Sequence, residues 1–492
     1  MSSLPAGETS PKQTAADSTD KPTATAIDQP MLIAGVAMAD TVVVLVAALL
    51  AAALLPEVLR AALWSPLLLG ILMSGVVIFA LQRTWAYTVA ALGNLVRQYA
   101  KAVGAIGAAF AALVATVYLT GFEASVPRQF LVSWLGFTLI GVAATRLALS
   151  WQIGRWMQAG RLTRRAVIVG GGRPAEELIK QLRRSKTAGI QVCGVFDDRA
   201  KDRSDNPVDR YRVLGSFDEM SDFCRAEAID LIIVTLPSTA EERILHLMKK
   251  LWVLPIDVRI SAHQSKLRLR PRAYSYIGDI PFLAVFDKPL SDWGWAVKEV
   301  EDRVIAVILI VLLSPVMLAV AIAVKYTSKG PVLFKQKRHG FNNQLVEVYK
   351  FRSMFTDMSD AAAVKLVTKD DPRVTPVGRF IRKTSLDELP QFFNVLKGEL
   401  SLVGPRPHAT QAKAGDRIYN DVVDGYYARH RMKPGITGLA QISGWRGETD
   451  TEEKIQRRVE CDIQYIDNWS VWMDLYILAM TPISLLNTKN AY

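Results

Sequence analysis

Cysteine is scarce in this sequence: only Cys193, Cys224 and Cys461 occur among 492 residues. The three are widely separated, and none lies in a CxxC pair or beside histidines at the spacing of a zinc site. A disulfide framework is therefore excluded, and no zinc site is indicated. This cysteine usage fits soluble parts that face a reducing cytoplasm.

The first 30 residues lack any apolar stretch and consist largely of Ser, Thr, Ala, Pro and Asp. A cleavable secretory signal needs an apolar region of roughly 7–15 residues, so we expect none here. The composition of residues 1–30 predicts a disordered tail, because it offers too little apolar surface to offset the loss of chain entropy on folding.

Hydrophobic and charged residues are unevenly distributed along the chain. Half of the residues are hydrophobic and 22% are charged, so apolar segments must alternate with polar ones. The 59 Lys and Arg exceed the 47 Asp and Glu, which gives a net charge of +12. Such an excess suits nucleic acid, anionic lipid or a phosphorylated substrate. The sequence therefore predicts a soluble part attached to a membrane part. A membrane part favours anionic lipid and a phosphorylated substrate over nucleic acid as the binding partners.

Four apolar runs cover residues 31–55, 64–81, 103–121 and 129–151. Each is close to the ~20 residues that a membrane-spanning helix requires, so four transmembrane helices are predicted within residues 31–155. The flanking Lys and Arg are in excess on alternate sides, which places both ends in the cytoplasm. Asp40 and Arg146 lie inside these runs. They indicate either an ion path or a packed pair, and we expect the pair.

Short β-branched runs alternate with helical stretches from residue 163 onward, at 166–169, 192–196, 231–234 and 256–260. This pattern predicts a parallel, Rossmann-like α/β domain of the CoA- or NAD-binding kind over residues 163–290. Gly170 and Gly172 follow the first strand in a GxGxxA pattern, and Asp197 ends the next strand where a ribose-binding acid would lie. Because Pro174 removes a backbone donor and no hydride-transfer site follows, the favoured interpretation is a domain that binds no dinucleotide or only senses one, and a dinucleotide site is the alternative.

Residues 304–324 form a run of 21 residues without charge, which by length is a fifth spanning helix. Ser314 and Pro315 fall at its centre, where proline removes a helical hydrogen bond and favours a break. A full crossing would place the following basic segment in the periplasm, away from the cytoplasmic phosphorylated substrates that its charge suits. We therefore expect a bent, re-entrant helix that enters and leaves on the cytoplasmic face.

The segment from residue 335 to residue 407 is dense in basic residues, glycine and proline. Arginine and lysine at this density can neutralise a diphosphate and a lipid phosphate together. The predicted phosphate-binding residues are Lys337, Arg338, Arg352, Arg373, Arg382, Lys383 and Arg406.

Asp387 and Glu388 are adjacent carboxylates in this segment, and Ser385 is a candidate N-cap for a helix that carries them in its first turn. One of the two carboxylates can attack phosphorus as a nucleophile. We expect the positive charges of Arg382, Lys383 and Arg406 to lower its pKa and keep it ionised. Both carboxylates are candidate ligands of Mg²⁺, the ion that oxygen ligands and a diphosphate favour. Considered alone, two acids in a first helical turn favour a structural role, because that composition is common there.

From residue 298 to the C-terminus the sequence resembles the catalytic domain of the monotopic phosphoglycosyl transferases, the bacterial sugar transferases. The matching segments are Ser314-Pro315, KFRSM (350–354), Arg382 with TSLDELPQ (384–391), SLVGPRP (401–407) and KPGITG (433–438). In this comparison Ser314, Pro315, Pro390, Pro405 and Pro407 would shape the site.

The resemblance implies a catalytic domain over residues 296–492 and a two-step reaction. Asp387 would attack the sugar-bearing phosphoryl group of a UDP-sugar, UMP would leave, and undecaprenyl phosphate would take the sugar phosphate, usually glucose or galactose 1-phosphate. Glu388 would assist with Mg²⁺ or a proton. The preceding helices and Rossmann-like domain resemble the layout of the large members, which begin exopolysaccharide or capsule units at the bacterial inner membrane.

The complete fold prediction is thus α/β plus membrane helices: a four-helix transmembrane bundle, a Rossmann-like parallel α/β domain, and a monotopic α+β catalytic domain with a re-entrant helix at 304–324. The aromatic C-terminal stretch 465–486 predicts one or two helices at the membrane surface, with Asp467 and Asp474 at the polar side. The histidines near the motifs, His339, His408 and His430, are expected to be spectators.

Three other functions are compatible with single features. The glycine turn suggests an NAD-dependent sugar-modifying enzyme, but residues 163–287 supply no convincing catalytic Tyr and Lys. The four apolar runs alone would fit a transporter. Nucleic-acid binding is not expected, because the basic residues are interleaved with turns and acids instead of stacking aromatics. The expected partners are a UDP-sugar, undecaprenyl phosphate and inner-membrane lipid. The oligomeric state is left open, with a homodimer as one option.

Overall fold

The computed structural model describes much of the chain between residues 29 and 486. The described residues are 29–55, 64–84, 86–88, 92, 95–121, 126–158, 162–185, 189–198, 211, 213–227, 229–236, 241–261, 274–277, 280–356, 371–407, 413–414, 417–418, 426–445 and 451–486. The predicted disordered tail lies, except for its last two residues, outside the described residues, as does His408.

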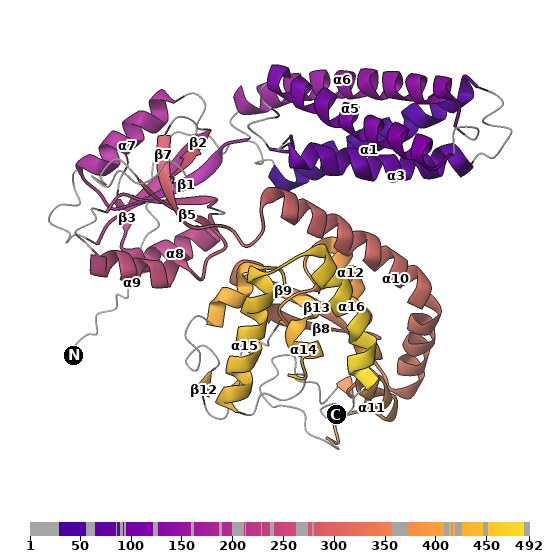
Figure 1. Ribbon diagram of the computed structural model, residues 1–492. Coiled ribbons are helices and arrows are strands. Elements are labelled where there is room, and N and C mark those ends of the chain that lie inside the picture. The colour runs from indigo at the N-terminus through magenta and orange to yellow at the C-terminus, as the bar shows by residue number, and fades with distance from the viewer. Residues whose placement is uncertain are drawn as a thin grey trace, which may run out of the picture.

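Four long apolar helices lie side by side in one group (Figure 1). They are α1 (Gln29–Ala53), α3 (Trp64–Arg83), α5 (Leu95–Leu119) and α6 (Arg128–Gln158). Helices α1 and α5 each pack against both α3 and α6. All four contain stretches long and apolar enough to cross a membrane. The four apolar segments predicted from the sequence therefore form helices, and α5 begins well before the predicted residue 103.

The two charges inside the helical group form a mutual pair. Nη2 of Arg146 lies 2.5 Å from Oδ2 of Asp40, and both side chains are about 1% exposed. The hydroxyl of Tyr87 donates to the same Asp40 oxygen at 2.8 Å. The ion pair and the Tyr87 hydrogen bond offset part of the free-energy cost of burying two charges among apolar helices, so the prediction of a packed pair is confirmed.

A seven-stranded sheet follows, in the order β3-β2-β1-β4-β5-β7-β6. Its strands are β1 (Arg164–Val169), β2 (Ile190–Phe196), β3 (Val213–Gly215), β4 (Leu231–Val234), β5 (Asp257–Ser261), β6 (Tyr274–Ile277) and β7 (Ile280–Phe286). Strands β1 to β5 pair in parallel as predicted. The sheet is mixed, however, because β7 pairs antiparallel with β5 and β6. That hairpin lacked a strong alternating pattern and was not predicted.

Helices cover both faces of this sheet. They are α7 (Arg173–Arg184), α8 (Phe217–Ala226) and α9 (Glu241–Leu251). Successive side chains of β1 point to opposite faces. Val167 therefore packs in the core formed with α8 and α9, whereas Ile168 packs in the core formed with α7. This layered arrangement is the α/β domain predicted from the β-branched runs.

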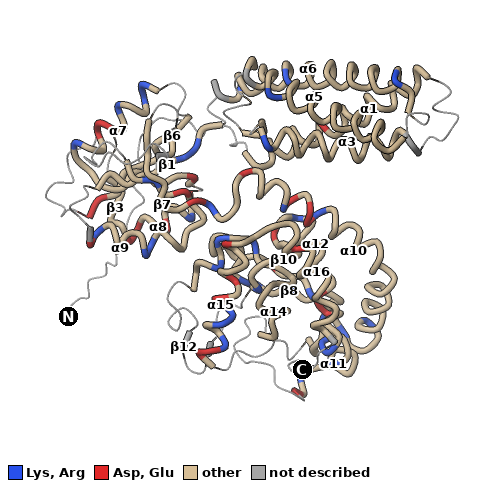
Figure 2. The backbone as a smooth tube through the Cα atoms, in the orientation of Figure 1, with Lys and Arg blue, Asp and Glu red and all other residues tan. Residues whose placement is uncertain are grey.

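The next helix, α10 (Asp292–Thr327), is 36 residues long and contains Pro315. The helix is not interrupted at the proline, so the predicted break is wrong, but it curves around the domain that follows (Figure 1). Proline bends a helix when it removes one hydrogen bond and crowds the preceding turn. The middle of α10 is almost free of charged residues (Figure 2), and Val311 and Leu312 are each 69% exposed.

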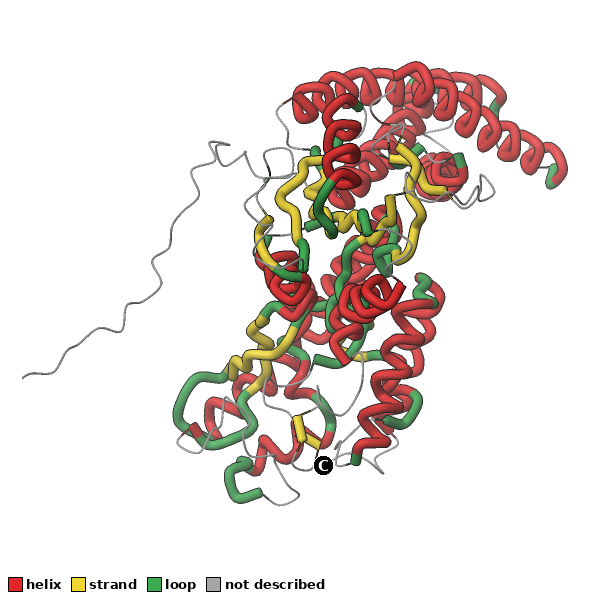
Figure 3. The backbone as a smooth tube through the Cα atoms, turned by 90° about the vertical axis from the view of Figure 1, so that its left-hand side faces the viewer, coloured by secondary structure: helices red, strands yellow, loops and turns green. Residues whose placement is uncertain are grey.

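The C-terminal domain is built from short elements around one core. Its strands are β8 (Leu333–His339), β9 (Leu345–Phe351), β10 (Ser401–Val403), β11 (Lys413–Ala414), β12 (Arg417–Ile418) and β13 (Gly435–Thr437). Its helices are α11 (Pro376–Lys383), α12 (Gln391–Lys397), α14 (Leu439–Ile442), α15 (Glu452–Asp467) and α16 (Val471–Leu486), with 3-10 turns η5 (Phe341–Asn343), η7 (Leu386–Glu388) and η8 (Tyr426–Arg431). Figure 3 shows the short strands set among helices and loops.

Both halves of α10 are attached to this domain. Ala306 packs in the core that contains Leu402 of β10. Val324, near the other end, packs with Phe351 and Ile381. One domain therefore holds the helix on both sides of its exposed apolar middle.

Of the one or two helices expected over residues 465–486, the structure has α16, preceded by the last three residues of α15. Trp472 is 81% and Tyr476 57% exposed, whereas Asp474 is fully buried. The expectation that Asp474 marks a polar surface is therefore wrong: its carboxylate pairs with Lys298 of α10 at 2.8 Å.

Candidate active site

The two adjacent carboxylates lie in the 3-10 turn η7, between α11 and α12. Ser385 has φ 58° and ψ 18°, the left-handed conformation, and its side chain makes no capping hydrogen bond. Thr384 ends α11, and Pro390 precedes the first residue of α12. The predicted N-cap role of Ser385 is therefore wrong. A tight connection between two short helices, instead of a helix start, presents Asp387 and Glu388.

Two cations hold Glu388. Nζ of Lys350 donates to its Oε1 at 2.8 Å, and Nη2 of Arg406 donates to the same oxygen at 2.8 Å. Burial alone would raise the pKa of Glu388, but the charges of Arg406 and Lys350 outweigh it and hold the pKa well below its usual value. Glu388 is therefore ionised at neutral pH and is the permanent counter-charge of the site.

Asp387 has a different environment. Within the described part of the chain its carboxylate has no hydrogen-bond or ion-pair partner. Burial raises the pKa of Asp387 to about 6, against the opposing charge of Lys350, and the charge of Glu388 adds to the rise. Burial outweighs the charges of Lys350, Arg382 and Arg406, which act in the expected direction, so the expectation of a lowered pKa for the nucleophile is wrong. A desolvated carboxylate without a partner, ionised above about pH 6, is nevertheless suited to nucleophilic attack.

The hairpin β8–β9 supplies two cations from one of its faces. Phe334 pairs with Lys350 and Arg338 pairs with Val346 in this hairpin. Since residues two apart share a face, Lys350 and Arg338 both point toward the dyad. Burial lowers the pKa of Arg338 to about 10, with the charge of Arg406 acting in the same direction. The guanidinium still carries its charge at neutral pH.

Lys350 was not among the predicted phosphate-binding residues, although the segment 350–354 was recognised. Two-residue alternation from the buried Val348 would have placed Lys350 on the inner face of β9.

Arg406 is held in place through its backbone. Its carbonyl accepts a hydrogen bond from Nη2 of Arg429 at 2.8 Å, and Arg429 pairs with Asp462 at 2.5 Å. Arg429 and Asp462 are almost fully buried. They were missed in the sequence, because nothing in the local pattern connects α15 and η8 to this segment.

The prolines predicted to shape the site contribute carbonyl groups. Pro407 accepts a hydrogen bond from Arg338 at 2.7 Å, and Pro405 accepts one from the N–H of Gly435 at 3.0 Å. Pro390 accepts one from the N–H of Phe393 at 3.1 Å. At the bend of α10, the Ser314 hydroxyl donates to the carbonyl of Val311 at 2.8 Å, one turn before Pro315.

Four of the predicted phosphate-binding residues have other surroundings. Arg352 is 4% exposed and donates to the Ser328 and Lys329 carbonyls, so it caps the C-terminal end of α10. Arg373 pairs with Asp371 at 2.6 Å. Lys337 is exposed on the face of β8 opposite to Arg338, and Lys383 is exposed at the end of α11. The structure brings together Arg338, Arg406 and the missed Lys350, with Arg382 near enough to lower the pKa of Asp387.

The residues present fit a Mg²⁺ ion held mainly by the substrate. No group of three or more His, Cys, Asp or Glu suited to a metal occurs among the residues described here. Glu388 is engaged by two cations, whereas the Asp387 carboxylate is without a partner there. Mg²⁺ commonly binds through one or two carboxylates together with substrate phosphates. Asp387 is therefore the better of the two predicted ligands.

In the glycine turn of the α/β domain, a backbone N–H is already hydrogen-bonded to a carboxylate of the same domain. Gly170 and Gly172 have φ of 97° and 86°, values that favour glycine. The N–H of Gly171 donates to Oδ2 of Asp197 at 2.9 Å. Asp197 therefore accepts from the turn that would bind a phosphate and brings a negative charge to it. This arrangement favours the interpretation that the turn binds no dinucleotide.

Two family models match the chain. Residues 293–488 match the bacterial sugar transferase family, and residues 82–262 match a CoA-binding domain. The first range contains α10 except for its first residue, the dyad, and the cations around the dyad.

The chain is also similar to curated proteins over most of its length. An undecaprenyl-phosphate glucose phosphotransferase from Komagataeibacter xylinus is 37% identical over 73% of this chain and 66% of that protein. A UDP-glucose:undecaprenyl-phosphate glucose-1-phosphate transferase from Klebsiella pneumoniae is 37% identical over 73% of this chain and 76% of its own length. A transferase of the same name from Xanthomonas campestris pv. campestris is 32% identical over 84% of each chain.

Proposed function

Because this chain belongs to the bacterial sugar transferase family, we propose that it transfers glucose 1-phosphate from UDP-glucose to undecaprenyl phosphate. The chain is a phosphoglycosyl transferase and a membrane-associated protein. The observation that carries the mechanism is the contrast within the dyad: Glu388 is held by two cations, whereas Asp387 is half-buried and without a partner among the described residues.

In the first step, an oxygen of Asp387 attacks the phosphorus that carries the sugar. The bond from this phosphorus to the bridging oxygen breaks, and UMP leaves with that oxygen and its electron pair. Arg406, Lys350 and Arg338 stabilise the charge that develops on the phosphoryl oxygens. In the second step, a phosphate oxygen of undecaprenyl phosphate attacks the same phosphorus and releases Asp387, which gives the lipid diphosphate sugar.

Mg²⁺ bound by Asp387 and the diphosphate would supply further charge neutralisation for the departing UMP. Glu388 keeps Lys350 and Arg406 in position and balances their charge when no substrate is bound. Its low pKa makes it a poor proton donor, so we assign it an electrostatic role.

The attachment of both halves of α10 to one domain supports the re-entrant arrangement. An exposed apolar middle can then enter the bilayer only as a bent segment that returns to the same face. We place this domain on the cytoplasmic face of the inner membrane, where a UDP-sugar is available. The product would begin a repeat unit of an exopolysaccharide or capsule.

The test is a lipid-free reaction of the purified full-length protein with UDP-glucose. It should release about one equivalent of UMP per enzyme and leave a hexose phosphate on the peptide that contains Asp387, as detected by mass spectrometry. Asp387→Asn should do neither, whereas the exposed control Asp467→Asn should behave as wild type. UMP release that requires undecaprenyl phosphate, with no trapped adduct, would favour direct transfer in a ternary complex. Substituting UDP-galactose or UDP-N-acetylglucosamine tests the choice of sugar.

A further inference from the structure

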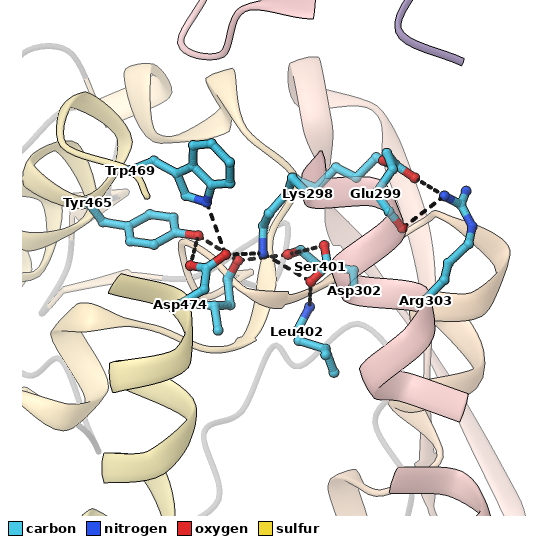
Figure 4. A network of polar contacts seen from close by, with 11 residues as sticks. Lys298, Glu299, Asp302, Arg303, Ser401, Leu402, Tyr465, Trp469 and Asp474 are labelled. Atoms are coloured by element: carbon cyan, nitrogen blue, oxygen red, sulfur yellow. Dashed lines mark hydrogen bonds and ion pairs between the residues drawn. The ribbon is translucent and has the colours of Figure 1, made fainter. Parts of the chain in front are cut away.

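A buried polar network connects four elements of the C-terminal domain (Figure 4). Its centre is Lys298 of α10, whose Nζ lies 3.0 Å from Oδ1 of Asp302 and 2.8 Å from Oδ2 of Asp474. Asp474 belongs to α16 and also accepts hydrogen bonds from the Tyr465 hydroxyl at 2.7 Å and the Trp469 indole at 3.0 Å. Lys298, Asp302 and Asp474 are each no more than 6% exposed.

This network contacts every residue of strand β10. Asp302 accepts hydrogen bonds from the Ser401 hydroxyl at 2.7 Å and from the N–H of Leu402 at 3.0 Å. The Tyr465 hydroxyl lies 3.0 Å from the carbonyl of Val403. The strand is thus fixed to α10 and α16 by side chains, in addition to its pairing with β13.

The network leaves no room for a ligand. All four carboxylate oxygens of Asp302 and Asp474 have partners. The cavity that borders Lys298 and Asp302 measures about 10 Å³, which is roughly the space of one water. Buried ion pairs often add little net stability, and in some proteins their role is to specify geometry.

Strand β10 leads directly into the active site. Gly404 follows it and packs backbone against backbone, since a Cβ there would lie 2.5 Å from the carbonyl of Lys433. Arg406 comes three residues after Val403 and contacts Glu388 at 2.8 Å. A shift of β10 would therefore move the guanidinium that the reaction needs.

We infer that Lys298, Asp302 and Asp474 are positioning residues of the transfer reaction. They hold β10 against α10 and α16, which both carry exposed apolar side chains, and so set where Arg406 meets the dyad. The position of Arg406 therefore depends on how α10 and α16 lie on the lipid surface. This inference rests on the proposed function.

The test compares Asp302→Asn with wild type in steady-state UMP release from UDP-glucose with undecaprenyl phosphate as the acceptor, using the full-length protein in lipid nanodiscs. Asp302→Asn should lower kcat at least tenfold and change KM less than threefold, because the side chain does not touch the substrate. Asp257→Asn, which removes a partly buried pair with Arg164 in the α/β domain, is the matched control and should stay within twofold of wild type.

A double substitution separates positioning from a general loss of structure. In an Arg406→Lys background, Asp302→Asn should reduce the rate less than threefold further, since both changes act through the same guanidinium. Fully multiplicative effects would overturn the inference. If Asp302→Asn does not fold, Ser401→Ala and Tyr465→Phe each remove one hydroxyl of the same network and should still lower kcat with an unchanged KM.

The outcomes distinguish this inference from the proposed function. A wild-type protein that releases no UMP would overturn both. A wild-type protein that releases UMP, together with an Asp302→Asn variant within twofold of its rate, would overturn the positioning role alone.

Discussion

Nζ of Lys350 lies 2.8 Å from Oε1 of Glu388, the oxygen that Nη2 of Arg406 also reaches at 2.8 Å. Two cations thus share one acceptor, and a surplus of positive charge remains beside Asp387. A diphosphate that enters the site meets donors that are already placed, so little reorganisation is needed when charge develops on the phosphoryl group.

Lys350→Met should remove one of these donors without changing the length of the side chain much. We expect kcat for UMP release to fall about 10²–10³-fold, the loss typical of one preorganised donor. The matched control is Lys335→Met, because Lys335 is 60% exposed on the opposite face of the same hairpin. A Lys350→Met enzyme with wild-type kcat would exclude Lys350 from the reaction.

The raised pKa of Asp387 predicts how the first step depends on pH. The attacking group is the ionised carboxylate, and its pKa is about 6. UMP release in the absence of lipid should therefore rise as the pH passes through about 6 and level off above it. Because the charge of Lys350 lowers the pKa of Asp387, Lys350→Met should move the midpoint to higher pH. A midpoint that moves down, or a rate independent of pH between roughly 5 and 8, would contradict this account.

Much of this site could be predicted from the sequence, because its chemistry is local in the chain. Asp387 and Glu388 are neighbours, and Arg382 and Arg406 lie in segments that recur in the family. Lys350 needed one further step, the two-residue alternation of a strand. The four apolar helices and the parallel strands followed in the same way from hydrophobic runs and β-branched residues.

The features that were not predictable depend on burial and on contacts distant in sequence. Basic residues around a carboxylate suggest a low pKa, yet desolvation reverses the direction for Asp387. Arg352 has the composition of a phosphate ligand but caps α10 from 24 residues away. The sequence suggests a surface position for Asp474, whereas in the structure its carboxylate pairs with Lys298 of α10.

Arg352 and Arg382 should therefore differ when substituted. Arg352→Gln removes the side-chain donor to the Ser328 carbonyl and one of the two donors to the Lys329 carbonyl, so unfolding should become easier by roughly 1–3 kcal/mol. The KM for UDP-glucose should stay close to wild type. Arg382→Gln should leave the unfolding transition unchanged and slow UMP release. Chemical unfolding and steady-state kinetics of both variants check this, and a raised KM with normal stability in Arg352→Gln would restore Arg352 as a phosphate ligand.

The re-entrant arrangement predicts which positions a membrane-impermeant thiol reagent can reach. After the three native cysteines are replaced, Leu54→Cys at the end of α1 should be labelled from the periplasm, since Leu54 is 62% exposed. Lys335→Cys, beyond α10, should be labelled only when the membrane is permeabilised. Labelling of Lys335→Cys in intact cells would show that α10 crosses the membrane. Pro315→Leu removes the cause of the bend and should reduce activity while the protein still reaches the membrane.

Removal of residues 1–290 should leave an active but less stable transferase. The dyad, its cations and the network around Lys298 all lie after residue 290, so the chemistry needs nothing from the first helices. The deletion removes contacts that stabilise α10. Trp293 stacks on Tyr87 at 4.9 Å between ring centroids, and Ala296 is buried in the same core as the four helices.

In the fragment the side chains of Trp293 and Ala296 are no longer covered by the four helices. We expect about 2–3 kcal/mol less stability from the exposed apolar surface, together with a greater tendency to aggregate. Trp293→Gln should make the fragment more soluble, whereas the same change in the full chain should destabilise it by removing the stack. Unfolding curves and UMP release for the four proteins decide the matter. A folded fragment without activity would mean that the helical group, through Tyr87 and Trp293, is required to set α10 for the reaction.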